Sequence, residues 1–248
     1  MALLHRIRAL SRPLGFIWLS FKVHYFAIKK ALFKDGIVSL NQFQKIRNAA
    51  AANLFVPLSE GFIAFEDTTV VSALVPAAHG KVLELGPGPG NQIQRFNESQ
   101  IEFIYALEPN SNYGDSLAFK VEKHGLTHKY KLITCGLEDS DVLRREGVAE
   151  GTMDTVLSIQ VLCAVDNPER AAKEAYKLLK PGGKLIFWEH VKSKDTIMGY
   201  LQGCRVDRDI KADILAAGEW ENPDEIEDPN DPHNFLPRVW GVLVKKVS

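Results

Sequence analysis

The sequence has few cysteines and no excess of charge of either sign. Its three cysteines, Cys135, Cys163 and Cys204, form no CxxC pair or other paired spacing, which argues against a disulfide scaffold and against a zinc site. Thirty basic residues against thirty-one acidic ones give a formal net charge of −1, whereas a nucleic-acid-binding domain is normally basic. We therefore expect a reducing compartment, no metal site and no nucleic-acid partner.

The N-terminal region also lacks a long apolar run. Its longest charge-free stretch, Pro13 to Phe21, has nine residues, whereas a membrane-spanning helix needs about twenty. No small-residue cleavage site follows this stretch, so a signal peptide fits poorly. We expect a cytoplasmic protein, with peripheral contact to an intracellular membrane as an open alternative.

Residues 1–31 have instead the pattern of a basic, amphipathic helix. Apolar residues recur every three or four positions from Leu3 through Ile17 to Ile28, and the segment holds six Lys or Arg residues and no acid. Such a helix can lie in a membrane interface with its basic residues at anionic headgroups, or it can pack against the rest of the protein. Both interpretations remain open, and we expect a helical extension over residues 1–79.

From residue 80 onward, short β-rich runs alternate with helical ones. The strand candidates are Lys81–Leu85, Phe103–Leu107, Tyr130–Thr134, Thr155–Ser158, Lys184–Trp188 and Val239–Val244. This alternation predicts an α/β fold with a doubly wound, mostly parallel, Rossmann-like sheet that is covered by helices on both faces. Such a sheet binds ligands at the carboxyl ends of its strands. We therefore assign residues 80–248 to one ligand-binding domain and expect its site directly after the strands.

A glycine-rich turn follows the first strand, in Glu84-Leu85-Gly86-Pro87-Gly88-Pro89-Gly90-Asn91. Glycines at alternate positions allow a sharp turn and a close approach to a ligand. A nicotinamide dinucleotide site would favour glycine or alanine in place of Asn91, and the two prolines remove backbone N–H donors for a pyrophosphate. The turn therefore indicates a ligand without phosphates, and the Glu84 carboxylate favours an ammonium group on that ligand.

A second carboxylate ends the second strand, in Leu107-Glu108-Pro109-Asn110. An acidic side chain about twenty residues after a glycine turn can accept both ribose hydroxyls of an adenosine. The turn and Glu108 together predict a binding site for an adenosine-containing ligand.

The order of these motifs resembles that of class I S-adenosylmethionine-dependent methyltransferases over residues 80–190. Glu84 to Gly90 is similar to the family's first motif, and Leu178 to Lys184 is similar to the turn before the fifth strand in the type-11 subfamily. Val161–Val165 and Glu189–Val191 resemble microsomal alkyl thiol methyltransferase-like proteins and fungal natural-product methyltransferases.

The resemblance implies a function and a cofactor. It implies a methyltransferase that uses S-adenosylmethionine to methylate a small, fairly apolar metabolite at sulfur, nitrogen or oxygen, with secondary-metabolite biosynthesis as one expected setting. The hydrophobic N-terminal extension of those relatives favours the membrane interpretation of residues 1–31. A nucleic-acid methyltransferase is disfavoured, because no N-P-P-Y-like motif follows the fourth strand.

The resemblance also implies which residues bind the cofactor. They are Glu84, Gly86, Gly88, Gly90, Asn91, Glu108, Pro109, Asn110, Gly136, Leu137, Glu138, Ser158 and Gln160. Gly136 stands where many relatives have an aspartate for the adenine amine, so adenine is expected on the backbone of Leu137 and on Glu138. Ser158 and Gln160 belong to the fourth-strand segment, which lies beside the methionine part in the family.

His190 is the expected catalytic residue. It follows the fifth strand at the edge where ligands bind, and a neutral imidazole near pH 7 can accept a thiol or phenol proton. A structural histidine is the alternative. Its neighbour Glu189 is expected to point outward from the strand, and Cys163 is expected to be a small, buried side chain.

One departure from the family pattern leaves a second function open. Only twelve residues separate Val191 from Cys204, whereas the corresponding stretch in the family is longer, aromatic and part of the acceptor pocket. A non-catalytic or partner-dependent protein with a methyltransferase fold is therefore the alternative to an active enzyme.

Overall fold

The structure is a computed structural model that describes residues 15, 18–30, 32–33, 40–191, 208–228 and 237–247. The chain divides into two compact units, residues 1–60 and 61–248, and each is described by itself. The boundary expected between residues 79 and 80 stays a prediction. The stretch between Val191 and Cys204 lies outside the described residues.

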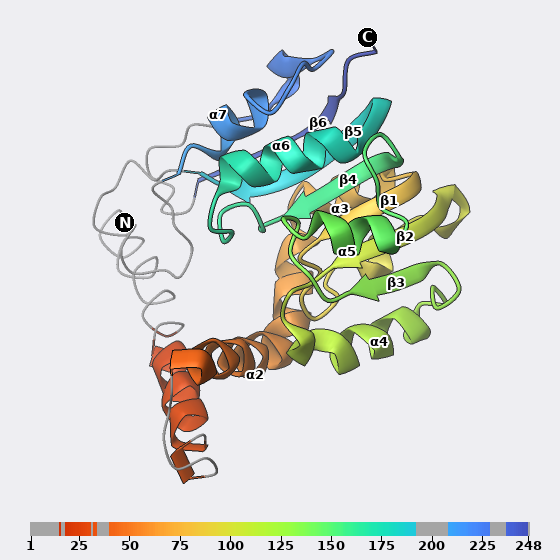
Figure 1. The fold of residues 1–248 in the computed structure, drawn as a ribbon. Helices are drawn as coiled ribbons and strands as arrows, with labels where there is room; N and C mark the ends of the chain where they lie inside the picture. The colour runs from red at the N-terminus through yellow and green to blue at the C-terminus, as the bar shows by residue number, and fades with distance from the viewer. Residues whose placement is uncertain are drawn as a thin grey trace, which may run out of the picture. The chain divides into compact units, whose positions relative to one another are not determined.

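A six-stranded sheet forms the centre of the larger unit (Figure 1). Its strands are β1 Gly80–Leu85, β2 Ile101–Leu107, β3 Tyr130–Ile133, β4 Met153–Ile159, β5 Leu179–His190 and β6 Arg238–Val244. The spatial order is β3-β2-β1-β4-β5-β6, with β1 to β5 parallel and β6 antiparallel to β5. The predicted mostly parallel, Rossmann-like sheet is confirmed.

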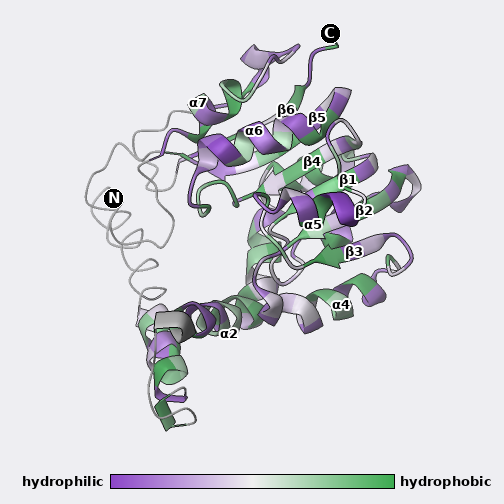
Figure 2. Ribbon diagram, viewed as in Figure 1, coloured by the Kyte–Doolittle hydropathy of each residue, from purple (hydrophilic) through white to green (hydrophobic). Residues whose placement is uncertain are grey.

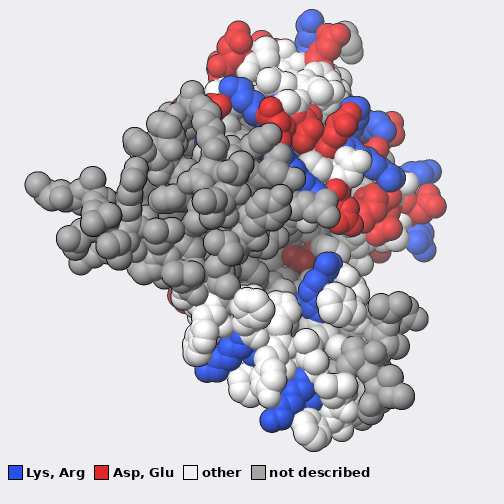
Figure 3. All heavy atoms as spheres, turned by 90° about the vertical axis from the view of Figure 1, so that its left-hand side faces the viewer, with Lys and Arg blue, Asp and Glu red and all other residues white. Residues whose placement is uncertain are grey.

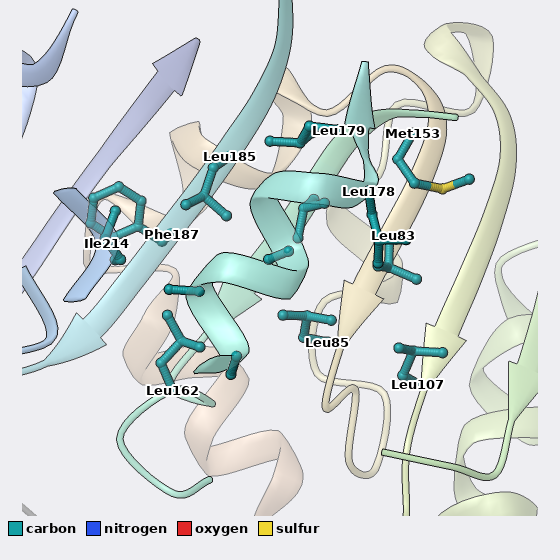
Figure 4. Packing of buried hydrophobic residues seen from close by; sticks show 14 of the residues in the cluster. Leu83, Leu85, Leu107, Met153, Leu162, Leu178, Leu179, Leu185, Phe187 and Ile214 are labelled. Atoms are coloured by element: carbon teal, nitrogen blue, oxygen red, sulfur yellow. The ribbon is translucent and has the colours of Figure 1, made fainter. Parts of the chain in front are cut away.

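Helices cover both faces of this sheet. They are the end of α2 Leu40–Glu66, then α3 Val71–Leu74, α4 Gly114–Lys123, α5 Ser140–Arg145, α6 Pro168–Leu178 and α7 Ile210–Leu215. One buried cluster packs α5, α6 and α7 against the first face, and part of it is shown in Figure 4. A second cluster packs α3 and α4 against the opposite face. The sheet is therefore doubly wound, as the sequence predicts.

The alternation of side chains along β5 explains how one strand serves both clusters. Leu185 and Phe187 belong to the cluster with α6 and α7, as Figure 4 shows. Ile186 and Trp188 belong to the opposite cluster. Successive side chains of a strand point to opposite faces, so a continuous apolar run is what a strand buried on both faces requires.

The amphipathic pattern of α6 shows why a helix forms beside this strand. The Asn167 side chain accepts the backbone N–H of Arg170, and Pro168 occupies the first helical position, which are both favourable at a helix start. The alanines of α6 are buried against the sheet, and hydrophilic residues alternate with them along the helix in Figure 2. Local sequence and burial therefore agree on the same element.

The strand order reverses between β1 and β4, which makes this point the topological switch point of the sheet. Leu85, the last residue of β1, pairs with Ser158 near the end of β4. The segments that leave these two strands therefore start side by side. Open α/β sheets bind their ligands at this point, so the predicted site residues converge on the expected edge.

The described part of the smaller unit is helical, over residues 18–30 and over the first part of α2. The side chains of Trp18, Phe21 and Phe33 are 66%, 73% and 82% exposed. Figure 3 shows the basic residues of this unit among uncharged ones in the lower part of the view. Across the described ranges, no helix is both long and apolar enough to span a membrane. Helices are thus present in the described part of the predicted N-terminal extension.

Candidate functional site

The glycine turn after β1 has a backbone that favours glycine. Gly86, Gly88 and Gly90 have positive φ angles of 53°, 54° and 84°, which side chains rarely allow. A Cβ atom at Gly86 would lie 2.9 Å from Val161, and one at Gly90 would lie 2.9 Å from Leu117. At Gly88 no atom of the described residues lies within 4 Å of the Cβ position, so the tip of the turn leaves room for a ligand against the backbone.

Glu84 places a buried carboxylate at the start of the turn. Its Oε2 accepts a hydrogen bond from the Tyr130 hydroxyl at 2.7 Å, and its Oε1 is buried with no hydrogen-bond partner among the described residues. Burial raises the pKa of Glu84 from 4.5 to about 7, the Tyr130 hydrogen bond opposes this rise, and the charge of Glu108 adds to it. A buried acceptor without a donor favours a ligand that brings a donor or a positive charge. The predicted ammonium group fits this atom.

Glu108 holds the same turn from the end of β2. Its Oε2 accepts the backbone N–H of Gly88 at 3.0 Å, and its Oε1 accepts that of Asn110 at 2.9 Å. Burial raises the pKa of Glu108, whereas these two hydrogen bonds lower it. Each carboxylate oxygen has a second lone pair, so both can also accept a ribose hydroxyl. Pro109 is exposed beside it, and Asn110 is buried.

The segment after β3 carries the predicted adenine contacts. The backbone N–H of Gly136 donates to Asp139 Oδ2 at 2.9 Å. The Glu138 carboxylate occupies the space that a Cβ atom on Gly136 would need, and Leu137 packs against the core. A side chain at Gly136 would therefore have to displace the Glu138 carboxylate, which is the end of a flexible side chain. The segment offers two acidic side chains near the place where an adenine amine is expected.

The structure contradicts the prediction that the Glu189 side chain points outward, because this side chain is fully buried. Its Oε1 accepts the Ser158 hydroxyl at 2.7 Å and the Val161 N–H at 3.0 Å, and its Oε2 accepts the Cys163 N–H at 3.4 Å. The prediction was wrong because the chain leaving β4 needs acceptors for its buried N–H groups, and Glu189 supplies them. The hydroxyl of Ser158 therefore faces Glu189.

Gln160 has a strained backbone directly after β4. It is the one non-glycine residue with a positive φ angle, 59°, in the described part of the chain. Its N–H donates to the carbonyl of Trp188 at 2.8 Å, and its Nε2 donates to Glu66 Oε1 at 3.4 Å. Such conformations persist where surrounding contacts fix them, and they cluster at functional sites. The structure brings Gln160 to the edge that the glycine turn occupies.

His190 ends β5, where it pairs with Arg238 of β6. The residue is 6% exposed, and its Nδ1 lies 3.6 Å from the sulfur of Cys163, which is buried as predicted. Its Nε2 is buried and has no hydrogen-bond partner among the described residues. An imidazole with one nitrogen in contact and the other without a partner can accept a proton from a ligand.

The sequence patterns did not indicate three residues that make hydrogen bonds to the predicted site, which are Glu66, Arg95 and Tyr130. Tyr130 acts on Glu84 across 46 positions, and Glu66 acts on Gln160 across 94. No local motif carries such long-range contacts. The structural role of Glu189 could have been inferred from its position in the sequence, since a carboxylate near a strand end can accept the free N–H groups of neighbouring loops.

Comparison with known proteins agrees with the geometry of this edge. A family model described as "Methyltransferase domain" matches residues 83–187. The human thiol S-methyltransferase TMT1B is 34% identical over 116 residues, which are 46% of this chain and 45% of the human protein. The matched region therefore spans less than half of that relative.

Two solved structures share the fold. An O-methyltransferase family protein from Burkholderia thailandensis aligns with a TM-score of 0.58 and 15% identity, over 95% of this chain and 71% of that one. The [4+2]-cyclase SpnF aligns with a TM-score of 0.57 and 16% identity, over 82% and 83%. At such identities the likeness shows the fold alone, and a fold does not define a reaction.

The strand order, the glycine turn and the matched family model together define a methyltransferase domain with a Rossmann-like sheet. Residues 83–187 therefore form a methyltransferase domain that is similar to class I S-adenosylmethionine-dependent methyltransferases, and this similarity implies S-adenosylmethionine as the cofactor. The described residues fit this cofactor, because among them Glu84 Oε1 is an acceptor without a partner and Gly88 leaves the turn open.

Proposed function

We propose that the enzyme is active and methylates a small, fairly apolar acceptor at sulfur, nitrogen or oxygen, with thiols as the first class to test. The observation that carries this proposal is the buried His190 Nε2, which has no partner among the described residues at the carboxyl end of β5. The human relative named as a thiol S-methyltransferase supports a sulfur acceptor. A thiol has a reference pKa of about 8.5 and needs less help than an aliphatic hydroxyl. A role in secondary-metabolite biosynthesis stays a prediction.

In this proposal the cofactor lies along the carboxyl edge from β3 to β4. Glu84 Oε1 receives its ammonium group, and Glu108 receives its ribose hydroxyls. The turn around Gly136 takes the adenine, and Gln160 lies beside the methionine part. The partnerless Glu84 oxygen and the open tip of the glycine turn support this placement.

His190 then has two tasks in methyl transfer. Bound S-adenosylmethionine supplies a methyl group on a positively charged sulfur. The protein has to align the acceptor at roughly 3–3.5 Å from that carbon and exclude water. His190 Nε2 would take the acceptor's proton while the acceptor's electron pair forms the new bond to the methyl carbon. The carbon–sulfur bond of the donor would break, with its electron pair left on the sulfur as a neutral thioether, and His190 Nδ1 would stay beside Cys163. The buried Trp188 on the same strand contributes an apolar surface at this place.

A labelled-methyl assay against apolar thiols, phenols and amines tests the proposal. We expect transfer to at least one class, and we expect His190→Gln to lower kcat by about 100-fold or more with an unchanged Kd for S-adenosylmethionine. His128→Gln is the matched control, because this histidine is exposed. If the wild-type protein binds the cofactor but methylates none of these classes, the non-catalytic alternative replaces the proposal.

We also propose that residues 1–31 attach the enzyme to an anionic intracellular membrane surface. Within the described residues of this segment, Trp18 and Phe21 are more than half exposed, and Lys22, Lys29 and Lys30 are exposed with no acidic neighbour in the segment. Exposed aromatic side chains combined with basic ones favour a lipid interface. The stripe residues before 15, including Leu3, lie outside the described residues.

Flotation with vesicles that contain anionic phospholipid tests this attachment. The full chain is expected to float with the vesicles, and a chain lacking residues 1–31 is expected to remain in the soluble fraction. Trp18→Ser with Phe21→Ser should weaken flotation, whereas Phe119→Ser, which changes an exposed aromatic residue of α4, should not. Full-length protein that stays in the soluble fraction would show that the segment packs on protein instead.

A further inference from the structure

A mostly buried polar cluster lies at the switch point, and Gln160 is its one member among the predicted site residues. We call it the switch-point cluster, and its members are Glu66, Asp67, Gln92, Arg95 and Gln160. They come from three segments: the end of α2, the chain after the glycine turn and the chain after β4. The cluster therefore joins the two segments that flank the cofactor site to a helix that precedes the sheet.

Arg95 is the centre of this cluster. Its Nη1 donates to Glu66 Oε2 at 2.9 Å, to the Asn91 carbonyl at 2.9 Å and to the Gln92 side chain. Its Nε and Nη2 donate to Asp67 at 3.0 Å and 2.7 Å, and Nη2 also donates to the Ile63 carbonyl at 2.9 Å. The planar guanidinium uses its fixed fork to hold backbone and side chains at once. Asn91, at the end of the glycine turn, is thereby tied to α2.

Glu66 carries the connection from Arg95 to Gln160. Its Oε2 accepts from Arg95 and also from Gln92 Nε2 at 2.9 Å, and its Oε1 accepts from Gln160 Nε2 at 3.4 Å. Glu66 and Arg95 are 3% and 8% exposed. Because both groups are buried, their contacts are little screened by water. The Asp67 side chain, by contrast, is 53% exposed.

Gln160 is the residue for which such support matters most. Its φ angle of 59° is unfavourable for a non-glycine residue, and it directly follows β4, beside the glycine turn. A strained conformation persists only when neighbouring contacts fix it. The Trp188 carbonyl holds its backbone, and Glu66 is the partner that holds its side chain.

We infer that Arg95 and Glu66 are positioning residues for the cofactor site: through Asn91 and Gln160 they fix the two segments between which S-adenosylmethionine binds. This inference rests on the proposed placement of the cofactor. Neither residue has to touch the cofactor. Their effect is to set the geometry of both walls of the site through one buried ion pair.

Calorimetric titration with S-adenosylmethionine tests the inference on the full chain. A variant with Arg95→Met and Glu66→Leu replaces the ion pair by apolar side chains, so no uncompensated buried charge remains to unfold the protein. We expect its Kd to rise by about tenfold or more, measured well below its melting temperature, since one or two supported ligand contacts are lost. If the two residues only stabilise the fold, the melting temperature falls while Kd stays within twofold, and the inference is overturned.

Two further variants sharpen this result. Asp67→Asn is the matched control, because it changes the exposed arm of the cluster and leaves the Glu66–Arg95 pair in place, so Kd should stay within twofold. Gln160→Ala, combined with the ion-pair variant, should add much less than its separate effect on Kd, because both changes act on the same residue. Fully additive effects would contradict the inference. If the wild-type chain does not bind S-adenosylmethionine at all, the proposed cofactor placement fails first.

Discussion

The carboxyl ends of β1 and β5 each carry a buried glutamate, and these two glutamates differ in the hydrogen-bond partners of their carboxylate oxygens. Glu84 at the β1 exit has one oxygen bonded to Tyr130 and one without a partner among the described residues. Glu189 at the β5 exit has both oxygens bonded, to the Ser158 hydroxyl and to two backbone N–H groups. Burial raises the pKa of each from 4.5 to about 7. The pKa therefore does not separate them, whereas hydrogen bonding does.

This difference shows how one residue type takes two roles on the same edge. Buried polar atoms are nearly always paired, so the partnerless oxygen of Glu84 points to a ligand that is part of the functional state. The complete set of partners around Glu189 points to a scaffold for the segment between β4 and α6. We therefore expect changes at the β1 side to affect cofactor binding, and changes around Glu189 to affect stability.

The largest effect on cofactor affinity is expected for Glu108, which follows β2 and accepts a hydrogen bond from the turn after β1. Glu108→Ala removes the acceptors proposed for the ribose and also the partners of Gly88 and Asn110. Each hydrogen bond to a charged group contributes roughly 1.5–3 kcal/mol, so the Kd for S-adenosylmethionine should rise at least about 100-fold. Calorimetry measures it, with Glu102→Ala, an exposed acid on the same strand, as the control. An unchanged Kd would remove Glu108 from the site.

Glu84→Gln should have the next largest effect, and it should depend on pH. An ammonium group beside Glu84 favours the carboxylate and lowers its pKa from about 7. Cofactor binding near pH 7 should therefore release protons from the wild-type protein but not from Glu84→Gln, whose Kd should be about tenfold higher. The observed binding enthalpy, plotted against the ionisation enthalpy of several buffers, gives the number of protons released. Equal slopes for both proteins would place the ammonium elsewhere.

Glu189→Gln should change stability with little effect on cofactor binding. A pKa raised from 4.5 to about 7 means that the folded state keeps a proton that the unfolded state has lost. The stabilisation from this group is therefore complete below about pH 4.5 and is lost as the pH rises through about 7.

The wild-type free energy of unfolding should fall across this range by on the order of 1 kcal/mol per pH unit for such a group. Denaturant melts at several pH values should show a smaller fall for Glu189→Gln, with part of the slope left because Glu84 titrates similarly. The Kd for S-adenosylmethionine should stay within twofold. A larger loss of cofactor affinity in Glu189→Gln than in Glu84→Gln would reverse the comparison.

The smallest effect is expected for Ser158→Ala. Its hydroxyl donates to Glu189, so its loss should cost about 1 kcal/mol and lower the melting temperature by roughly 2–4 °C. Cofactor affinity should not change, which calorimetry can check. A higher Kd would support the cofactor-binding role expected from the sequence, in place of the structural one.

The sequence alone was sufficient for most of the fold, since each of the six predicted strands overlaps an observed one. The start of β5 differs, because the strand begins at Leu179, inside the segment that was expected to form a turn. It also located the glycine turn, because the three positive φ angles require glycine. It was wrong about Glu189, because alternation along a strand assumes a solvated side, whereas β5 is buried on both faces. The roles of the predicted cofactor-binding residues and of His190 remain predictions.

What the sequence by itself determined is the order of strands and helices, the turn after β1 and the chemical types available at the edge of the sheet. These follow from periodicity and from backbone preferences, which act over a few neighbouring residues. Only the tertiary structure decided which carboxylates have all their hydrogen-bond partners and which has an oxygen with no partner in the described part of the chain. Those outcomes depend on partners such as Tyr130 for Glu84 and Gln160 for Glu66, 46 and 94 positions apart, which folding alone brings within hydrogen-bond distance.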